Sequence, residues 1–469
     1  MTEMIQVSGE DTLADIRSEI RQLTEEILYV IAKRVKLSQK IGYIKKNEGL
    51  PIEDISVERN LRKLVQEKSV HLGMNPKLGL RLMNLIVAES KSVQLNVIKN
   101  EAITPSIMLQ KAMEMENKGE EIIHLEAGEP DFPPASKILN ATKEALNKGQ
   151  TNYVDPVGIE PLREAIASHL NKKYHLNITT KQVLITHGAR FALYLAITTN
   201  ISPGGSALFF EPAYPAFRQI VESVEGRPVA ISTRLENGWT PDVKTVEDLF
   251  DDPPDIMILN SPSNPTGKNL SINVINQLIK FATEKGVIVI SDEVYKDYVF
   301  NQYKSILEYN KCRSIFISSF SKSHSMTGYR IGYAIGSKED ISRMASLGNL
   351  ALTCLPEFVQ RSAIMALECQ DIVEKNVDTI HSRAMYLCDL LDDLPVEYYP
   401  PDGGFYVFPR FNRSGFNSET FALNLLRKNH VSVVPGTAFG DFPNFLRISL
   451  CQPKEKIADA VRRMENALR

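Results

Sequence analysis

Apolar residues recur at alternating steps of three and four near the start of the chain, at positions 13, 16, 20, 23, 27, 30, 37, 41 and 44. This spacing places them along one side of a helix and predicts a coiled-coil-like seam over about 35 residues. Gly49-Leu50-Pro51 ends the pattern, a second helix is expected from about Asp54, and the segment 73–76 introduces a third that ends near Gln94. Three such helices do not readily close a core within one chain, so we expect a dimeric helical bundle.

Beyond about residue 100 the sequence changes to short apolar runs that alternate with helical stretches and with glycine and proline. Five runs are continuously apolar: VLIT (183–186), ALFF (207–210), IMIL (256–259), VIVIS (287–291) and SIFIS (314–318). Such runs are typical of a parallel sheet that is covered on both faces. We therefore predict an α/β domain at 105–469, after a helical domain at 1–95 and a linker at 96–104.

The composition sets limits on the function. The chain has 469 residues, more than one core usually supports, and a net charge of -3 without a basic cluster, so we expect no nucleic-acid partner. No apolar run approaches the ~18 residues of a membrane span, and the polar start MTEMIQVSGEDTL lacks the apolar core of a signal peptide. The five scattered cysteines lack ligand spacing, so we expect thiols in a reducing cytoplasm and no metal site.

The strongest motif follows the run SIFIS and reads SFSKSHSMTGYR, from Ser319 to Arg330. Lys322 stands just beyond a strand end, where its amine can enter a cavity and form an imine with a carbonyl group. Ser319 and Ser321 supply hydroxyls, and Arg330 can bind a phosphate dianion through two parallel hydrogen bonds. A surface loop is the alternative for a single SxSK match, but further motifs accompany this one.

Two polar residues follow other apolar runs. Asp292, in SDEVY, closes the run VIVIS, where a buried carboxylate needs a partner. A protonated pyridine nitrogen would be such a partner, and the pairing would keep a pyridine cofactor an electron sink. Asn264, in NSPSNPTG after IMIL, can donate to a phenolic oxygen, although a simple turn is the alternative.

Gly188-Ala189-Arg190 opens a helix after the run VLIT, where free backbone N–H groups can bind a phosphate. Tyr214, in EPAYP, is placed to stack on the face of an aromatic ring.

These motifs together resemble the class I aminotransferases of fold type I, over about residues 100–469. The resemblance implies pyridoxal 5′-phosphate as cofactor, a mostly parallel large domain at about 140–370, and a small α+β domain at about 105–139 and 371–469. It implies that Lys322 holds the cofactor as an imine and shuttles a proton, that Asp292 pairs with the pyridinium, and that Asn264 and Tyr295 contact the phenolate.

The resemblance also assigns the phosphate and the substrate. It implies that the phosphate is bound by Ser319, Ser321, Arg330, the helix start at Ala189 and Arg190, and Tyr153 of the neighbouring subunit. Arg447, in FLRIS, resembles the arginine that binds the substrate α-carboxylate, and Gly128, in AGEPDF, resembles a glycine near the substrate. Arg190 stands where relatives that use aspartate and prephenate carry a lysine for a second carboxylate. A helix-start arginine that points to solvent or to an acidic neighbour is the alternative.

Arg34 interrupts the seam of the first helix, at a position where the pattern requires an apolar residue. A guanidinium inside a bundle needs a counter-ion, from the protein or from a ligand. Lys45 follows 11 residues later, about 20° from the same helix face, so the two cations face one crevice. Solvated bundle faces are the alternative for such charges. Two further pairs are spaced one helical turn apart: Asp54 with Glu58, and Ser90 with Gln94.

This set resembles the all-helical chorismate mutases, whose intertwined dimer binds dianionic chorismate between its helices, and the match runs from about Leu13 to Gln94. The resemblance implies that the carboxylates are bound by Arg34 and, from the partner subunit, Arg17. It implies Lys45 and Gln94 at the breaking ether oxygen, Glu58 at the hydroxyl, and Asp54 and Ser90 in support.

The reaction is pericyclic and requires no nucleophile, which agrees with a site of Arg, Lys and Gln. Val57 departs from the family, because many relatives carry an arginine there; this predicts a weaker hold on one carboxylate.

We therefore expect a homodimeric, bifunctional enzyme of aromatic amino acid synthesis. It would rearrange chorismate to prephenate, and it would transfer an amino group from glutamate or aspartate to prephenate, an arylpyruvate or oxaloacetate. Two alternatives remain: a helical domain that only senses chorismate or prephenate or drives dimerisation, and a general aspartate aminotransferase beside an active mutase. Lys45 and Gln94 favour an active mutase, because a binding module needs no donors at a breaking bond.

Overall fold

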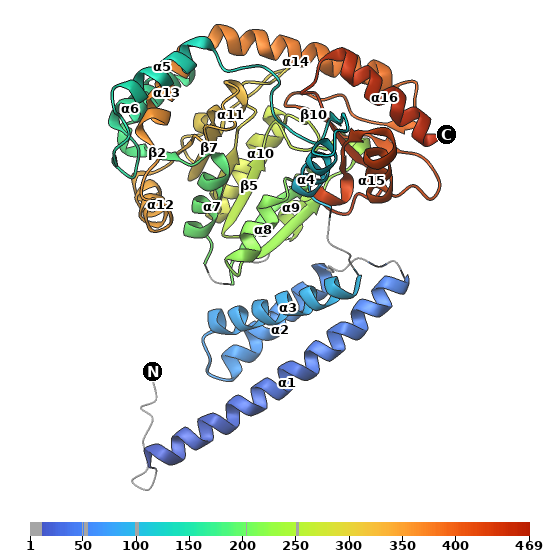
Figure 1. Ribbon diagram of the computed structural model, residues 1–469. Helices are drawn as coiled ribbons and strands as arrows, with labels where there is room; N and C mark the ends of the chain where they lie inside the picture. Colours follow the sequence, from blue (N-terminus) through green and yellow to red (C-terminus); the bar gives the residue numbers. More distant parts are fainter. Residues whose placement is uncertain (1–11, 49, 51–54, 99–102, 203, 250–252) are drawn as a thin grey trace. The chain divides into compact units, whose positions relative to one another are not determined.

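The computed structural model of the protein describes residues 12–48, 50, 55–98, 103–202, 204–249 and 253–469. It divides into two units, Met1–Glu101 and Ala102–Arg469, which are considered separately below (Figure 1). Among the described residues, no helix is both long enough and apolar enough to cross a membrane.

Within its described part, the N-terminal unit forms helices α1 (Leu13–Glu48), α2 (Ile55–His71) and α3 (Pro76–Ile98). α1 begins where the Thr12 hydroxyl accepts a hydrogen bond from the backbone N–H of Asp15 at 3.2 Å, as an N-cap residue does. α3 packs against both α1 and α2. The helical N-terminal region is thus confirmed, but α3 extends beyond the end near Gln94 that the pattern predicts, because no glycine or proline interrupts it before Ile98.

The apolar seam of α1 is largely uncovered within this single chain. Its nine side chains are 36–64% exposed: Leu13, Ile16, Ile20, Leu23, Ile27, Val30, Leu37, Ile41 and Ile44. The buried residues of α1 are the small Ser38 and Gly42, so α3 covers only part of this long helix. A continuous exposed apolar stripe of this kind is the usual mark of an association surface.

A seven-stranded sheet forms the centre of the second unit, in the order β2-β8-β7-β6-β5-β3-β4. Its strands are β2 (Val183–Thr186), β3 (Ser206–Glu211), β4 (Arg227–Ser232), β5 (Ile256–Asn260), β6 (Ile288–Asp292), β7 (Ser314–Ser319) and β8 (Gly332–Ile335). β8 runs antiparallel to both neighbours, and the other pairs are parallel. The mostly parallel sheet is confirmed, and all five apolar runs form strands of it.

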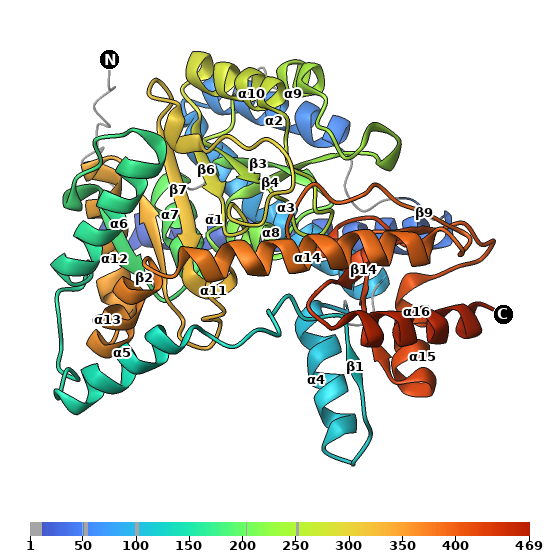
Figure 2. The ribbon, with the colours of Figure 1, turned by 90° about the horizontal axis from the view of Figure 1, so that it is seen from above.

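Helices cover both faces of this sheet (Figures 1 and 2). One face packs against α6 (Glu160–Tyr174), α10 (Ile272–Lys285) and α13 (Glu357–Ala366). The other face packs against α7 (Ala189–Asn200), α8 (Ala216–Ser223) and α12 (Lys338–Ala351). Successive residues of β6 alternate between the two cores, with Val289 in the first and Ile290 in the second, which explains why the strand reads as continuously apolar.

A third core joins segments from both ends of this unit. It combines residues 103–125 with residues 380–464, and it includes Tyr295 and Tyr298 from the turn after β6. Its helices are α4 (Pro105–Glu116), α14 (Gln370–Leu391), α15 (Ser418–Asn429) and α16 (Lys454–Leu468). Its strands include β1 (Ile123–His124), paired with β12 (Val431–Ser432), and β14 (Leu446–Ser449), between β10 (Tyr406–Val407) and β13 (Val434–Pro435). Figure 2 shows the long helix α14 running from beside α13 toward α16, which belongs to this third core.

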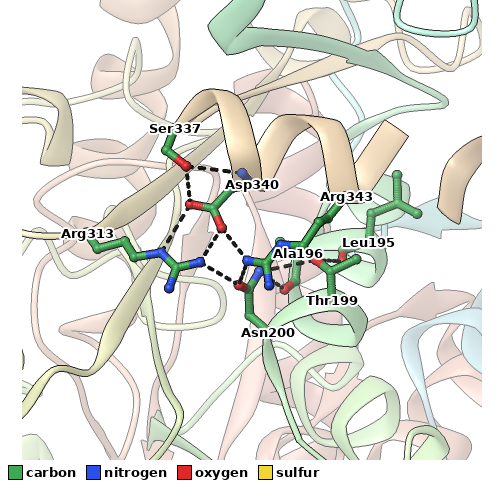
Figure 3. Close-up of polar contacts among 8 residues, drawn as sticks. All are labelled: Leu195, Ala196, Thr199, Asn200, Arg313, Ser337, Asp340 and Arg343. Atoms are coloured by element: carbon green, nitrogen blue, oxygen red, sulfur yellow. Dashed lines mark hydrogen bonds and ion pairs between the residues drawn. The ribbon is translucent and has the colours of Figure 1, made fainter. Parts of the chain in front are cut away.

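Helix α7 is held at its C-terminal end by a polar network (Figure 3). Asp340, in the first turn of α12, is fully buried and accepts hydrogen bonds from Arg313 and Arg343. Arg343 also donates to the side-chain oxygen of Asn200, the last residue of α7, at 2.8 Å. The Ser337 hydroxyl donates to Asp340 at 2.8 Å. This network sets the position of α7, whose opposite end reaches the site described next.

Candidate active sites

Lys322 lies in α11 (Phe320–Ser323), a single turn directly after β7. Its half-buried side chain donates from Nζ to the carbonyl oxygen of Gly128 at 2.7 Å. Burial lowers the pKa of Lys322 to about 8, and the charges of Arg447 and Arg330 act in the same direction. An amine with a pKa this low is available as a nucleophile near neutral pH.

Asp292 ends β6, next to β7, and is 7% exposed. Its carboxylate accepts one hydrogen bond, from the backbone N–H of Val294 at 3.3 Å. Burial raises the pKa of Asp292 to about 7, with a further contribution from Glu293. A carboxylate in this position is stabilised by a cation, and a protonated ring nitrogen is a cation of suitable chemistry.

Arg447, on β14, is only 3% exposed. Its Nη1 donates to the side-chain oxygen of Asn264 at 3.0 Å, and its Nη2 donates to the carbonyl oxygen of Glu126. Its guanidinium carbon lies 4.2 Å from the ring centre of Tyr406, and its Nε is buried without a hydrogen-bond partner among the described residues. A buried cation with an unused N–H group is suited to an anionic ligand.

Tyr406 lies against three predicted site residues, namely Arg447, Tyr295 and Gly128. Its hydroxyl lies 3.0 Å from that of Tyr295, and a Cβ atom added to Gly128 would lie 1.6 Å from the same hydroxyl. Gly128 is therefore required because Tyr406 packs directly over it, and its carbonyl is thereby presented to Lys322. Sequence reasoning missed Tyr406, although an aromatic residue shortly after the glycine pair in DGGFY was a signal for close packing.

An anion-binding cradle forms where α7 begins. Gly188 precedes the helix with a φ of 79° and without a side-chain cap, so the first backbone N–H groups of α7 lie outside the helical hydrogen-bond ladder. A Cβ atom added to Gly188 would lie 2.8 Å from Nη2 of Arg330, so the guanidinium lies directly beside this helix end. Ser319, at the end of β7, and Ser321, in α11, are both buried, and in the sequence they precede Arg330 by about ten residues.

Arg190 and Tyr214 meet although they are 24 residues apart. Arg190 donates from Nε to the Tyr214 hydroxyl at 2.8 Å and from Nη2 to the same oxygen. Arg190 is itself exposed, and its side chain contacts Tyr214 rather than an acidic neighbour among the described residues. Its role toward substrate stays a prediction. Tyr153 is 85% exposed within this chain, so the structure of one subunit places no ligand contact on it.

The predicted mutase residues are distributed over all three helices of the N-terminal unit. On α3, Ser90 and Gln94 are both 7% exposed, and the side-chain oxygen of Gln94 is buried without a hydrogen-bond partner in the part of the chain that the structure describes. On α1, Lys45 is half-buried, whereas Arg17 and Arg34 are exposed. Asp54 lies outside the described residues.

Glu58, on α2, forms an ion pair that sequence reasoning missed. Nζ of Lys91, on α3, lies 2.8 Å from Oε1 of Glu58, and the two side chains are 18% and 19% exposed. The Ser90 hydroxyl donates to the carbonyl oxygen of Ile86 at 2.7 Å, within its own helix. The only signal for Lys91 was its place between Ser90 and Gln94.

A lysine with a low pKa and a buried carboxylate lie at the carboxyl ends of neighbouring parallel strands, and a buried arginine from a second sheet reaches Asn264 beyond the next strand. This arrangement defines an α/β enzyme with a cofactor-type site. Residues 120–464 match the family "Aminotransferase class I and II", and residues 16–95 match "Chorismate mutase type II". The chain belongs to the class I and II aminotransferases and carries a type II chorismate mutase domain ahead of that fold. Members of this aminotransferase family use pyridoxal phosphate.

Relatives cover the aminotransferase part. The aspartate aminotransferase of Sulfolobus acidocaldarius is 34% identical over 359 residues, which are 74% of this chain and 90% of that protein. A probable aspartate/prephenate aminotransferase of Aquifex aeolicus is 31% identical over 76% of this chain and 94% of its own length. The structure of the Thermus thermophilus aspartate aminotransferase with maleate is 29% identical, with a TM-score of 0.75 over 79% of this chain and 97% of that one.

Proposed function

We propose that the protein is a bifunctional enzyme. Its helical unit rearranges chorismate to prephenate, and its α/β unit transfers an amino group from glutamate or aspartate to a 2-oxo acid, with prephenate, an arylpyruvate or oxaloacetate as acceptor. The observation that carries the transferase half is Arg447: a buried guanidinium with an unused N–H group, in the same site as a lysine whose pKa is lowered.

The donor set of the α/β unit fits pyridoxal 5′-phosphate. The start of α7 and Arg330 form a cradle for a phosphate dianion, and Gly188 keeps that cradle open because any side chain there would meet Arg330. Ser319 and Ser321 add hydroxyl groups. Asp292 supplies the carboxylate for a ring cation, and Lys322 supplies the amine.

When bound, this cofactor withdraws electrons from the carbon that carries the amino group. The chain itself positions and moves protons. Lys322 would move the proton, because its Nζ, with a pKa lowered to about 8, could accept a proton from the substrate α-carbon and release it again near the working pH. Arg447 binds the α-carboxylate, and its hydrogen bond to Asn264 fixes the orientation of that carboxamide. Tyr295 is held in place by Tyr406.

For the mutase half, two features support an active site. The oxygen of Gln94 is buried without a partner among the described residues of one subunit, which supports a ligand or a second chain that completes its surroundings. Lys45, Gln94 and the arginines are donors, and donors suffice for a reaction in which charge grows on an ether oxygen. Arg17 and the exposed seam of α1 favour a homodimer in which each subunit serves the other's site. Tyr153 has the corresponding role in the transferase.

Dicarboxylic substrates are favoured by the relatives. Two of them are described as aspartate or aspartate/prephenate aminotransferases, and the Thermus thermophilus enzyme was solved with maleate, a dicarboxylate. Arg190 is the residue that we assign to the second carboxylate. The names of these relatives also support oxaloacetate as an acceptor, which keeps a general aspartate aminotransferase as the second candidate. The free thiols of all five cysteines agree with the cytoplasmic location that we propose.

A substrate panel tests the proposal. Purified protein with added pyridoxal phosphate is assayed with prephenate, phenylpyruvate, 4-hydroxyphenylpyruvate and oxaloacetate, each with glutamate and with aspartate, and separately with chorismate alone. Chorismate turnover together with preferred amination of prephenate or an arylpyruvate supports the bifunctional enzyme. Preference for oxaloacetate supports the general aspartate aminotransferase. Binding of chorismate without turnover would show that the helical unit is a sensor.

A further inference from the structure

Helices α2 and α3 are joined by an ion pair inside the predicted mutase site. Nζ of Lys91 lies 2.8 Å from Oε1 of Glu58, and both side chains are about four-fifths buried, at 18% and 19% exposure. A pair that is this far from water contributes little net stability, because the loss of hydration of both ions offsets most of their attraction. Its position therefore calls for a functional explanation.

Lys91 lies among the residues that the site requires. It precedes Gln94 by three residues, and Ser90 precedes Gln94 by four, so both Lys91 and Ser90 neighbour Gln94 on the surface of α3. Ser90 and Gln94 are both buried, and the Gln94 oxygen has no hydrogen-bond partner among the described residues. An ammonium group can donate to more than one acceptor, so pairing with Glu58 does not prevent Lys91 from also contacting a ligand.

The charges of the site require a cation at this place. A dianionic substrate is repelled by an uncompensated Glu58 carboxylate, and this repulsion is strong where water is partly excluded. Val57, one residue before Glu58, is apolar and 59% exposed, so position 57 supplies no charge. Lys91 brings a positive charge to Glu58 from the neighbouring helix instead.

We propose that Lys91 is a substrate-binding residue of the mutase site. Its ammonium group contacts a carboxylate of the dianionic substrate while it remains paired with Glu58, and it thereby supplies from α3 the charge that Val57 does not supply from α2. This inference rests on the proposed function of the helical unit. The proposed Lys91 contact would compensate for the weaker hold on one carboxylate that Val57 by itself predicts.

A double-mutant cycle in the full-length enzyme tests this role. Lys91→Met, Glu58→Gln and the double variant are compared in chorismate turnover, with Lys77→Met as control, since Lys77 is an exposed lysine at the start of the same helix. In the Glu58→Gln background the carboxylate that pairs with Lys91 is removed. We expect Lys91→Met to raise KM for chorismate about ten- to a hundredfold even in that background, the cost of a lost charged hydrogen bond. A change below about twofold there would show that Lys91 acts only through Glu58, and would overturn the proposal.

Two charge-restoring variants extend the test. Lys91→Arg should retain KM within about fivefold, because the charge is kept although its shape differs. Adding Val57→Arg to Lys91→Met should recover at least about a tenth of the lost kcat/KM, since the charge returns on the adjacent helix. Transaminase activity and helical circular dichroism of each variant report folding, and the double variant, which removes both charges, leaves no unpaired ion to destabilise the helices.

The proposed function can fail separately. Wild-type protein without chorismate turnover would refute an active mutase, and prephenate binding by calorimetry then decides the role of Lys91. A Kd that rises about tenfold or more in Lys91→Met supports the ligand contact. An unchanged Kd, or no prephenate binding by the wild type, overturns it.

Discussion

Nη1 of Arg447 donates to the side-chain oxygen of Asn264 at 3.0 Å, across 183 residues of sequence. One residue is expected at the substrate carboxylate and the other at the cofactor, so the contact joins the two halves of the transferase site. The backbone of Asn264 is also fixed, because its N–H donates to the side-chain oxygen of Asn260 at 2.9 Å. Substrate binding at Arg447 therefore acts on a carboxamide that is already held in place.

Lys322→Ala should abolish transamination and the visible absorbance of protein-linked cofactor, while chorismate turnover stays unchanged. The reason is that Lys322 is the amine assigned to the cofactor, and the residues assigned to the two sites do not overlap. Spectra and both activities are measured on one preparation, with Lys338→Ala as an exposed control on α12. A variant that still links the cofactor would show that another lysine carries it.

Asp292→Asn should stabilise the cofactor-free protein at high pH. Burial raises the pKa of Asp292 to about 7 from 3.8, so the folded chain keeps a proton that the unfolded chain releases earlier. Stability contributed by this carboxyl is thus full below pH ~4 and declines as the pH rises to about 7, by on the order of 4 kcal/mol. Thermal unfolding of cofactor-free wild type and variant at pH 5 and pH 8 should show a gap that grows with pH. A constant gap would contradict the assigned pKa.

Lys45→Ala and Gln94→Ala should each lower chorismate turnover by roughly a hundredfold or more, because a lost donor at the developing oxyanion costs ~3 kcal/mol. Bound cofactor and transamination should be unaffected. Ser92→Ala, at an exposed position of α3, the helix that carries Gln94, is the matched control. Near-normal turnover in both variants would place the mutase site elsewhere.

Mixing chains should reveal shared mutase sites. A Lys45→Ala chain and an Arg17→Ala chain, exchanged at equal amounts, form hybrids in half of the dimers, and each hybrid has one intact site, giving about a quarter of wild-type activity. Each variant exchanged with itself is the control. Verified subunit exchange without recovered turnover would refute the assignment of Arg17 to the partner's site.

Arg190→Ala should raise KM for glutamate, aspartate and prephenate about ten- to a hundredfold, the effect of a lost charged hydrogen bond, and leave phenylalanine and phenylpyruvate nearly unaffected. Tyr214→Phe is the companion variant, because Arg190 donates to the Tyr214 hydroxyl. If both variants impair all substrates equally, Arg190 serves to hold Tyr214 rather than to bind a carboxylate.

Local patterns predicted the elements of this fold but not all of their partners. Continuous apolar runs predicted five strands, because both faces of those strands are buried. β8 was missed since the four residues GYAI gain strand structure only by pairing with β2 and β7. β4, RPVAIS, was missed because its proline and polar ends obscure the apolar pattern.

The sites divide in the same way. Lys322, Asp292 and Asn264 were recognisable because each follows a strand within a short motif. The contacts of Arg190 with Tyr214 and of Lys91 with Glu58 join residues 24 and 33 positions apart in different elements, and no local pattern encodes them. For the same reason Tyr406, which packs over Gly128, was visible only in the folded chain.

Helix α7 links the Asp340 network to the phosphate cradle. Its 12 residues span ~18 Å and move as one rod, so a loosened grip on Asn200 displaces the N–H groups beside Gly188. Arg343, which donates to Asn200, and Arg313, which shares Asp340 with it, therefore lie at the end of α7 opposite the proposed phosphate cradle. If the cradle binds the coenzyme as proposed, sequence drift at that distant end of the helix would change how tightly the coenzyme is held, while the reacting groups themselves stayed intact.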